Sequence, residues 1–204
     1  SAIFLTVMTL CEAGDHLVVS SQLYGGTVNL FRLTLPKFGI KATFVKPRDT
    51  EGFKKAIQEN TKCIFGELVG NPGNELMNMP EVSKIAKEAG IPLIIDSTYQ
   101  TPYLFKPLEH GADIVVHSLT KWMAGHGSSM AGILVEGGKF DFLKTSTKEV
   151  PMKGVVRTTL PMAELKKATK HYFEIGDFTT SNYKDLTYEE KLSAKRFLLI
   201  PVFA

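Results

Sequence analysis

Apolar runs of strand length alternate with amphipathic segments from residue 1 to about residue 134, and Gly, Pro and Asn separate them. This rhythm is typical of βαβ units, in which helices connect the strands of a parallel sheet. The sequence therefore predicts an α/β fold, with a mostly parallel sheet flanked by helices.

Several individual elements can be predicted from the same pattern. A helix is expected over Ala2–Leu10, before Gly14, and a second one over residues 80–89, where Pro80 lies in the first turn and Gly90 follows the last. Strands are expected over residues 16–20, 43–45, 63–65, 92–96 and 113–116.

The last two of these strands lead into polar residues. The run over residues 92–96 is almost entirely apolar, as in a strand covered on both faces, and ends in Asp96. The run over residues 113–116 leads through Ser118 and Thr120 to Lys121. Ligands of open parallel sheets bind beyond the carboxyl ends of the strands, so Asp96 and Lys121 are expected in one crevice.

An Asp and a Lys in one crevice can serve two different purposes, and their spacing in the sequence does not distinguish between them. They can form a structural salt bridge, or the lysine can attack a carbonyl and form a Schiff base. In the second case Asp96 suits the ring nitrogen of pyridoxal 5'-phosphate (PLP), whose protonation makes the ring an electron sink. Tyr24 could supply an aromatic face for that ring, and Ser118 and Thr120 could supply hydroxyl donors.

The pattern changes after residue 142. Residues 143–204 contain two helix-like segments, 162–173 and 188–198, and no alternation that continues the sheet. We predict a domain over residues 1–142 and a tail or incomplete C-terminal subdomain over residues 143–204. The chain also begins at Ser1 without Met and inside an apolar pattern, so we expect the start of a longer protein to be missing.

Composition narrows the possible partners. The net charge is +3 and the pI is near 8.7, with scattered basic residues, so neither nucleic acid nor membrane is expected. The longest apolar stretch, residues 2–11, is far shorter than the roughly 20 residues of a membrane span. Cys11 and Cys63 are too few for a disulfide framework, so we read them as core residues of a cytoplasmic protein.

Other common ligand signatures are missing from the sequence. The histidines His110, His117 and His126 lack the spacing of a metal-binding helical pair, so no metal site is expected. Neither a Gly-x-Gly-x-x-Gly stretch nor a Walker A loop occurs.

A series of short motifs occurs in order along residues 1–142. They are Gly14-Asp15-His16, Leu23-Tyr24-Gly25-Gly26-Thr27, Gly66-Glu67, Gly70-Asn71-Pro72, Asp96-Ser97-Thr98, Thr101-Pro102-Tyr103-Leu104, Glu109-His110-Gly111-Ala112-Asp113, His117-Ser118-Leu119-Thr120-Lys121 and Gly125-His126-Gly127. Together they resemble the Cys/Met-metabolism family of PLP-dependent enzymes. The stretch from His117 to Gly127, followed by Gly137-Gly138-Lys139-Phe140-Asp141, most resembles the O-acetylhomoserine sulfhydrylase branch.

The resemblance implies a role for each matching residue in a fold type I, aspartate aminotransferase-like domain. Lys121 matches the lysine that binds PLP as a Schiff base and moves protons at the substrate, and Asp96 matches the partner of the pyridine nitrogen. Tyr24 matches a catalytic tyrosine that stacks on the ring. The other matches line the cofactor cleft, and they are Ser118, Thr120, Glu67 and Asn71.

The implied reaction is a γ-replacement in sulfur amino-acid and methionine biosynthesis. O-acetyl-L-homoserine would react with sulfide or methanethiol to give homocysteine or methionine and acetate, which makes the protein a transferase. A methionine or cystathionine γ-lyase, or a truncated relative that serves as a binding module, are the alternatives. The resemblance also implies a homo-oligomer, a dimer of dimers with shared active sites.

Some parts of the family pattern have no match in this sequence. The Gly-containing phosphate turn is expected just before Ser1, and the Tyr and Arg that the family donates across the dimer interface are expected further upstream. The Arg that binds the substrate carboxylate is not identified either, because Arg157 and Arg196 lie in different contexts.

Overall fold

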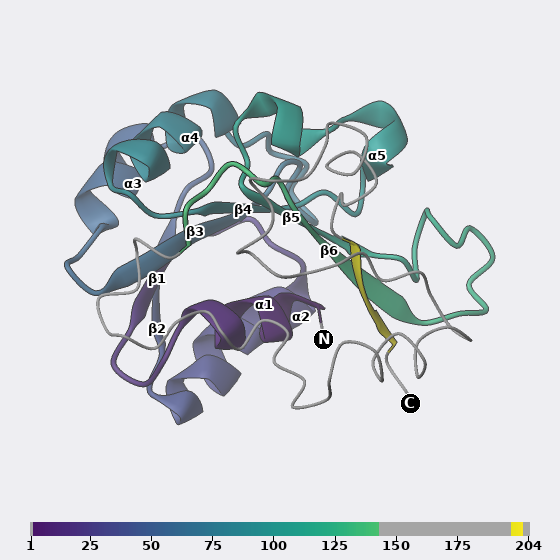
Figure 1. The fold of residues 1–204 in the computed structure, drawn as a ribbon, viewed down its shortest axis with the longest axis horizontal. Helices are drawn as coiled ribbons and strands as arrows, with labels where there is room; N and C mark the ends of the chain where they lie inside the picture. The colour runs from purple at the N-terminus through teal and green to yellow at the C-terminus, as the bar shows by residue number, and fades with distance from the viewer. Residues whose placement is uncertain (1, 143–196, 202–204) are drawn as a thin grey trace, which may run out of the picture.

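A seven-stranded sheet runs through the middle of the molecule, with helices on both faces (Figure 1). The structure is a computed structural model, and it describes residues 2–142 and 197–201. Helices α1 and α2 cover one face, and α3 and α4 cover the other. The helices are α1 (Ala2–Leu10), α2 (Gly25–Asn29), α3 (Thr50–Ala56), α4 (Met79–Glu88) and α5 (Thr101–Leu104), with the short turns η1 (Leu30–Thr34), η2 (Leu35–Phe38) and η3 (Pro107–His110).

The strands lie in the order β2-β1-β3-β4-β5-β6-β7. They are β1 (His16–Ser20), β2 (Lys41–Val45), β3 (Thr61–Glu67), β4 (Leu93–Asp96), β5 (Ile114–Ser118), β6 (Ala131–Glu136) and β7 (Phe197–Pro201). The first five are parallel, and β6 and β7 run antiparallel to their neighbours. The strand order reverses between β1 and β3, because the chain leaves β1 for β2 on one side and returns to β3 on the other.

Local sequence signals explain where several of the helices begin and end. The turn after α1 contains Gly14, whose φ of 98° is in the left-handed region that glycine tolerates. Pro80 lies in the first turn of α4, where the missing N–H costs no hydrogen bond. Asp49 caps α3, because its side chain accepts a hydrogen bond from the Gly52 N–H at 2.8 Å.

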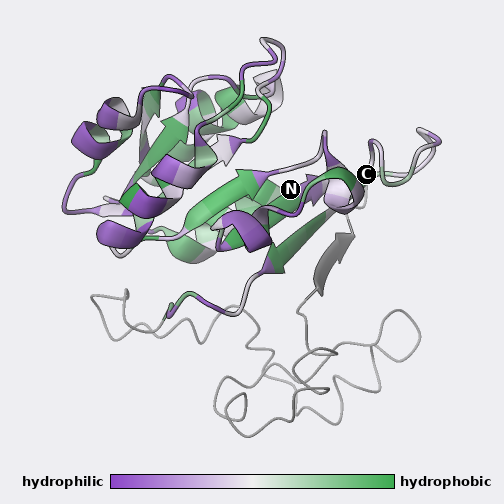
Figure 2. Cartoon of the chain, turned by 90° about the horizontal axis from the view of Figure 1, so that it is seen from above, coloured by the Kyte–Doolittle hydropathy of each residue, from purple (hydrophilic) through white to green (hydrophobic). Residues whose placement is uncertain are grey.

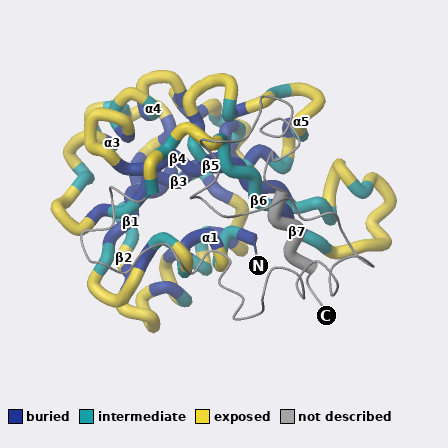
Figure 3. The backbone as a smooth tube through the Cα atoms, viewed as in Figure 1, coloured by how far each residue is buried: buried dark blue, intermediate teal, exposed yellow. Residues whose placement is uncertain are grey.

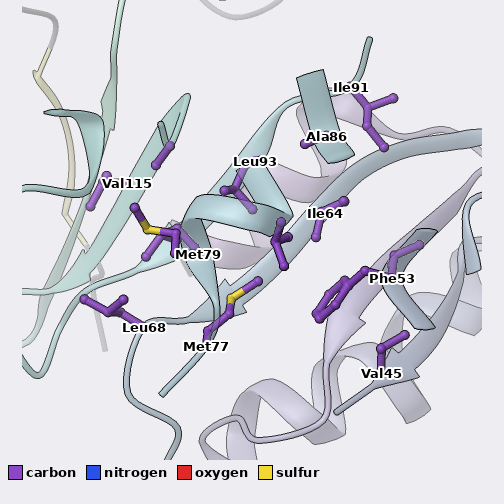
Figure 4. Packing of buried hydrophobic residues seen from close by; sticks show 14 residues of the cluster. Val45, Phe53, Ile64, Leu68, Met77, Met79, Ala86, Ile91, Leu93 and Val115 are labelled. Carbon is purple, nitrogen blue, oxygen red and sulfur yellow. The ribbon is translucent and has the colours of Figure 1, made fainter. Parts of the chain in front are cut away.

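Each face of the sheet buries its own apolar cluster. On one face Phe53 of α3 and Met79 and Ala86 of α4 lie over Ile64 and Leu93 of the strands (Figure 4). On the other face α1, η1 and η2 bury Val7, Phe31, Leu35 and the two free cysteines. The expected core position of Cys11 and Cys63 is thus confirmed.

The distribution of polarity and burial follows these layers. The central strands are mainly hydrophobic, whereas the helices carry hydrophilic residues as well (Figure 2). Strands β3, β4 and β5 are largely buried, and the outer turns of α3 and α4 are exposed (Figure 3). No helix among the described residues is long and apolar enough to cross a membrane.

The predicted α/β class and its parallel strands are confirmed, but the end of the chain differs. Phe197 and Leu198, expected at the end of a helix over residues 188–198, belong to β7, which pairs with β6 and continues the sheet. The prediction was wrong there because a short, wholly apolar run fits a buried helix or a strand equally well. Residues 162–173 and 188–196 lie outside the described residues, and the boundary at residue 142 stays a prediction.

Candidate active site

One pocket of about 910 Å³ opens at the carboxyl ends of β3, β4 and β5. This is the edge of the sheet, next to the reversal of strand order, where open α/β folds bind ligands. Every candidate residue identified in the sequence lines this pocket. They are Tyr24, Glu67, Asn71, Asp96, Ser118, Thr120 and Lys121.

Strand alternation directs three of these side chains to the same face of the sheet. Residues two positions before each of them, namely Phe65, Ile94 and Val116, belong to the apolar cluster under α1 and η1. Since every second residue of a strand shares a face, Glu67, Asp96 and Ser118 lie on the α1 side as well. Glu67 is also paired directly with Asp96 across β3 and β4.

Asp96 is held in place by the residue two positions further on. Its Oδ1 accepts hydrogen bonds from the Thr98 hydroxyl at 2.6 Å and from the Thr98 N–H at 2.9 Å. Burial raises the pKa of Asp96, and the two bonds from Thr98 oppose that rise. Within residues 2–142 no donor binds its second oxygen, Oδ2, which is therefore available to a ligand.

Thr98 is a pocket residue that the sequence analysis did not single out. Its hydroxyl accepts a hydrogen bond from the Ser118 N–H at 2.7 Å, and so it connects the ends of β4 and β5. The available signal was the Asp-x-Thr spacing, because Asp and Thr two residues apart readily form side-chain-to-backbone turns.

Glu67 is a buried carboxylate, only 7% exposed, that joins two loops. Its Oε1 accepts from the Tyr24 N–H at 2.7 Å, and its Oε2 accepts from the Asn71 N–H at 3.1 Å. Burial raises the pKa of Glu67 to about 7 against the effect of these bonds, and the neighbouring Asp96 adds to the rise.

Tyr24 stands at the N-cap of α2, with 55% of its surface exposed. Its carbonyl accepts hydrogen bonds from the N–H groups of Thr27 and Val28. The tyrosine ring lies against Gly26, since a Cβ at that position would come within 2.7 Å of the ring atom Cε1. Gly26 therefore leaves room for the Tyr24 ring on the pocket wall.

Lys121 follows β5 and is exposed where it lines the pocket. The preceding Thr120 is hydrogen-bonded to β6. Its hydroxyl accepts a hydrogen bond from the Ala131 N–H at 3.1 Å and donates one to the Ala131 carbonyl at 3.3 Å. The salt bridge between Lys121 and Asp96, left open by the sequence, is not among the ion pairs of the described chain. Among the described residues no ion pair holds the Lys121 side chain, which faces the pocket.

The first turn of α1 completes the pocket wall with Ala2, Ile3 and Phe4. Gly132 of β6 allows this close approach, because a Cβ there would lie 2.8 Å from the Cβ of Ala2. A helix N-terminus with unpaired N–H groups favours anions. His117 also lines the pocket, and its Nδ1 lies 3.0 Å from the Ser97 carbonyl.

No cluster of His, Cys, Asp and Glu within the described residues is arranged to hold a metal ion. Large apolar side chains surround the pocket instead. The rings of Tyr99 and Trp122 meet edge to face at 6.2 Å, and Met130 is 65% exposed.

Known proteins with similar sequences include PLP-dependent enzymes of the kind that this pocket would suit. The model of the Cys/Met metabolism PLP-dependent enzyme family matches residues 1–159. The chain is 51% identical over 142 residues to the O-acetyl-L-homoserine sulfhydrylase of Leptospira meyeri, covering 70% of this chain and 32% of that protein. It is 45% identical over 149 residues to the homocysteine synthase of Schizosaccharomyces pombe, covering 72% and 35%. The chain thus spans about a third of the length of these relatives.

Solved structures show the same fold. The cystathionine γ-lyase of Lactobacillus plantarum, crystallised with L-serine, superposes with a TM-score of 0.63 at 37% identity, over 66% of this chain and 35% of that one. A Campylobacter jejuni protein described as an O-acetylhomoserine (thiol)-lyase superposes with a TM-score of 0.69 at 38% identity, over 71% and 36%, and its crystal structure holds a pyridoxyl-lysine phosphate. The chain belongs to the Cys/Met metabolism family of PLP-dependent enzymes.

Proposed function

We propose that this chain forms the PLP-binding part of an O-acetylhomoserine sulfhydrylase. The reaction is a γ-replacement, in which O-acetyl-L-homoserine and sulfide give homocysteine and acetate, or methanethiol gives methionine. The observation that carries the proposal is the pocket itself, because residues from five separate segments of the chain and the start of α1 meet around it. Similarity to the sulfhydrylase and homocysteine synthase relatives supports the choice of reaction.

The residues present fit PLP. The free Oδ2 of Asp96 suits a hydrogen bond from the protonated pyridine nitrogen, and the Lys121 Nζ suits covalent attachment to the aldehyde carbon. The N–H groups at the start of α1 and the hydroxyls of Ser118 and Thr120 suit the phosphate. When bound, PLP supplies an electron sink for carbanions of the substrate.

The chemistry required of this chain's own residues is proton transfer and positioning. The Lys121 amine takes the substrate α proton and moves protons at the β carbon, and the acetate then leaves from the γ carbon. Tyr24, on the pocket wall, would stack its ring on the bound cofactor and assist the acid–base steps from its hydroxyl. Asn71 lies on the same wall and suits the ring oxygen.

A γ-lyase is the second candidate, and the superposition with the cystathionine γ-lyase favours it. The early proton transfers are the same in both reactions. The two differ in whether a thiol captures the unsaturated product or water converts it to a keto acid and ammonia. Product analysis with and without sulfide separates them.

The proposal includes a homo-oligomer, a dimer of dimers with shared sites, in the cytoplasm. The exposed apolar side chains beside the pocket, Tyr99, Trp122 and Met130, support a second copy as their cover. The thiols of Cys11 and Cys63 are both free, and the cytoplasm keeps thiols reduced.

The deciding experiment is an absorbance spectrum of the full-length protein with PLP, before and after borohydride reduction. We expect a visible band that reduction removes, with the reduced label on Lys121, and we expect Lys121→Ala to lose turnover while it stays folded. Full activity of Lys121→Ala, or a label on another lysine, would overturn the assignment. A protein that takes up no PLP would instead support the truncated, non-catalytic relative.

A further inference from the structure

We infer that Glu67 is a positioning residue that clamps the Tyr24 and Asn71 loops against the pocket while its carboxylate is charged, and that protonation loosens this clamp. The clamp itself is a property of this chain. Its link to PLP rests on the function proposed above.

Glu67 affects the pocket indirectly, through the two backbone segments that it binds. Both of its oxygens are already engaged, one by the Tyr24 N–H and the other by the Asn71 N–H. Tyr24 is 43 residues away in sequence, and it precedes the short helix α2. A single side chain at the end of β3 therefore fixes two loops that both contribute to the pocket wall.

The charge state decides how strongly the two loops are held. A carboxylate accepts at both oxygens, and charge-assisted bonds are stronger than neutral ones. A proton on one oxygen makes that atom an O–H donor and a weaker, uncharged acceptor toward the backbone N–H that it faces. Hence one of the two loops is held by a weakened hydrogen bond when Glu67 becomes neutral.

The surroundings place this change near neutral pH. Burial is the largest influence on Glu67 and raises its pKa to about 7. The other titratable side chains on the pocket wall are Tyr24, Asp96, His117 and Lys121, while the lining residues of the loop after β3 carry no charge. Of these, the charge of Asp96 favours protonation of Glu67. The two backbone bonds lower this pKa, so breaking either of them while Glu67 stays buried raises it further, and protonation then favours the loosened state. The clamp is thus expected to hold above about pH 7 and to loosen below it.

Asp113 offers a matched control. It is also a carboxylate whose pKa is raised by burial, and it also accepts a backbone hydrogen bond, from the Leu93 N–H at 2.8 Å. However, Asp113 directly precedes β5, at the opposite end of that strand from the pocket. Asp113→Asn therefore removes the same kind of charge without touching the two loops.

The test is hydrogen exchange of the full-length protein, read at the Tyr24 and Asn71 amides and corrected for the intrinsic pH dependence of exchange. For the wild type we expect protection to fall about tenfold between about pH 8 and about pH 6. Glu67→Gln should show low protection at both pH values, and Asp113→Asn should behave like the wild type. Wild-type protection in Glu67→Gln, or equal losses in both variants, would overturn the inference.

A second measurement connects the clamp to the cofactor. We expect Glu67→Gln to bind PLP at least about tenfold more weakly than the wild type at about pH 8, with less change toward about pH 6. Glu67→Asp keeps the charge and should retain part of the protection and of its pH dependence, which covers the case that Glu67→Gln does not fold. If the wild type itself binds no PLP, the proposed function fails, while hydrogen exchange still decides on the clamp.

Discussion

At the scale of single residues, the space beside Tyr24 is controlled by one of two adjacent glycines. A Cβ at Gly26 would lie 2.7 Å from the Tyr24 ring, whereas a Cβ at Gly25 would meet nothing within 4 Å. Both glycines belong to α2, so alanine stabilises the helix by a similar amount, about 0.5–1 kcal/mol, at either position. Only the substitution at Gly26 has to move the ring.

We therefore expect Gly26→Ala to lower kcat of the γ-replacement about tenfold, because a displacement of about 1 Å in a catalytic group has effects of this size or larger. Gly25→Ala is the control, and its kcat should stay within about twofold of the wild type. Steady-state kinetics with saturating PLP measures both variants. Equal activity of the two would mean that the position of Tyr24 does not matter for the reaction.

The candidate site could largely be predicted at this scale, but its supporting bonds could not. Asp96 and Lys121 follow from the rule that polar residues at the carboxyl ends of parallel strands meet. Glu67 and Asn71 depended on motif resemblance, since on their own they read as an ordinary strand end and turn. The bond from Tyr24 to Glu67 spans 43 residues, and no local pattern reports such a contact.

At the scale of elements, Thr98 connects the ends of two strands on which site residues stand. Its hydroxyl donates to Asp96 at the end of β4 and accepts from the Ser118 N–H at the end of β5. Removing the hydroxyl leaves that N–H without its partner, a loss of about 1–3 kcal/mol when the group is buried. It also leaves Asp96 Oδ1 with the bond from the Thr98 N–H alone, so the carboxylate is held less firmly in the pocket.

We expect Thr98→Val, which keeps the shape of the side chain, to lower the free energy of unfolding by about 1–2 kcal/mol and to weaken PLP binding. Thr98→Ser keeps the hydroxyl and should restore most of both properties. Urea unfolding and a PLP titration measure the pair. The bridging role would be refuted by a valine variant that matches the serine variant in both experiments.

The strands also show which elements local sequence patterns fail to predict. The parallel strands were predictable because each is a buried apolar run followed by a turn or a polar residue. β6 was not singled out, and the first two residues of β7, Phe197 and Leu198, were assigned to a helix, since both strands depend on pairing across the end of the sheet. Such pairing joins distant residues, so the identity of the element is decided by tertiary contacts.

At the scale of the whole molecule, the pocket lies where several segments that are distant in the sequence meet. Its wall includes α1, the loop after β1, the ends of β3, β4 and β5, and the start of β6. The sheet pairs the strands, and α1 approaches β6 closely at Gly132. A ligand that contacts all of them opposes global unfolding as well as local opening, because every separation of these elements breaks its site.

PLP is therefore expected to stabilise the folded protein by about 2.7 kcal/mol at a free concentration of about 100 times its Kd. Thermal unfolding at increasing PLP concentrations measures this effect. Pyridoxal without its phosphate is the matched ligand, and it should stabilise less at equal concentration, since the N–H groups at the start of α1 then lack their anion. Equal stabilisation by both compounds would show that the phosphate does not lie at α1, and a Tm unaffected by PLP would contradict binding at this pocket.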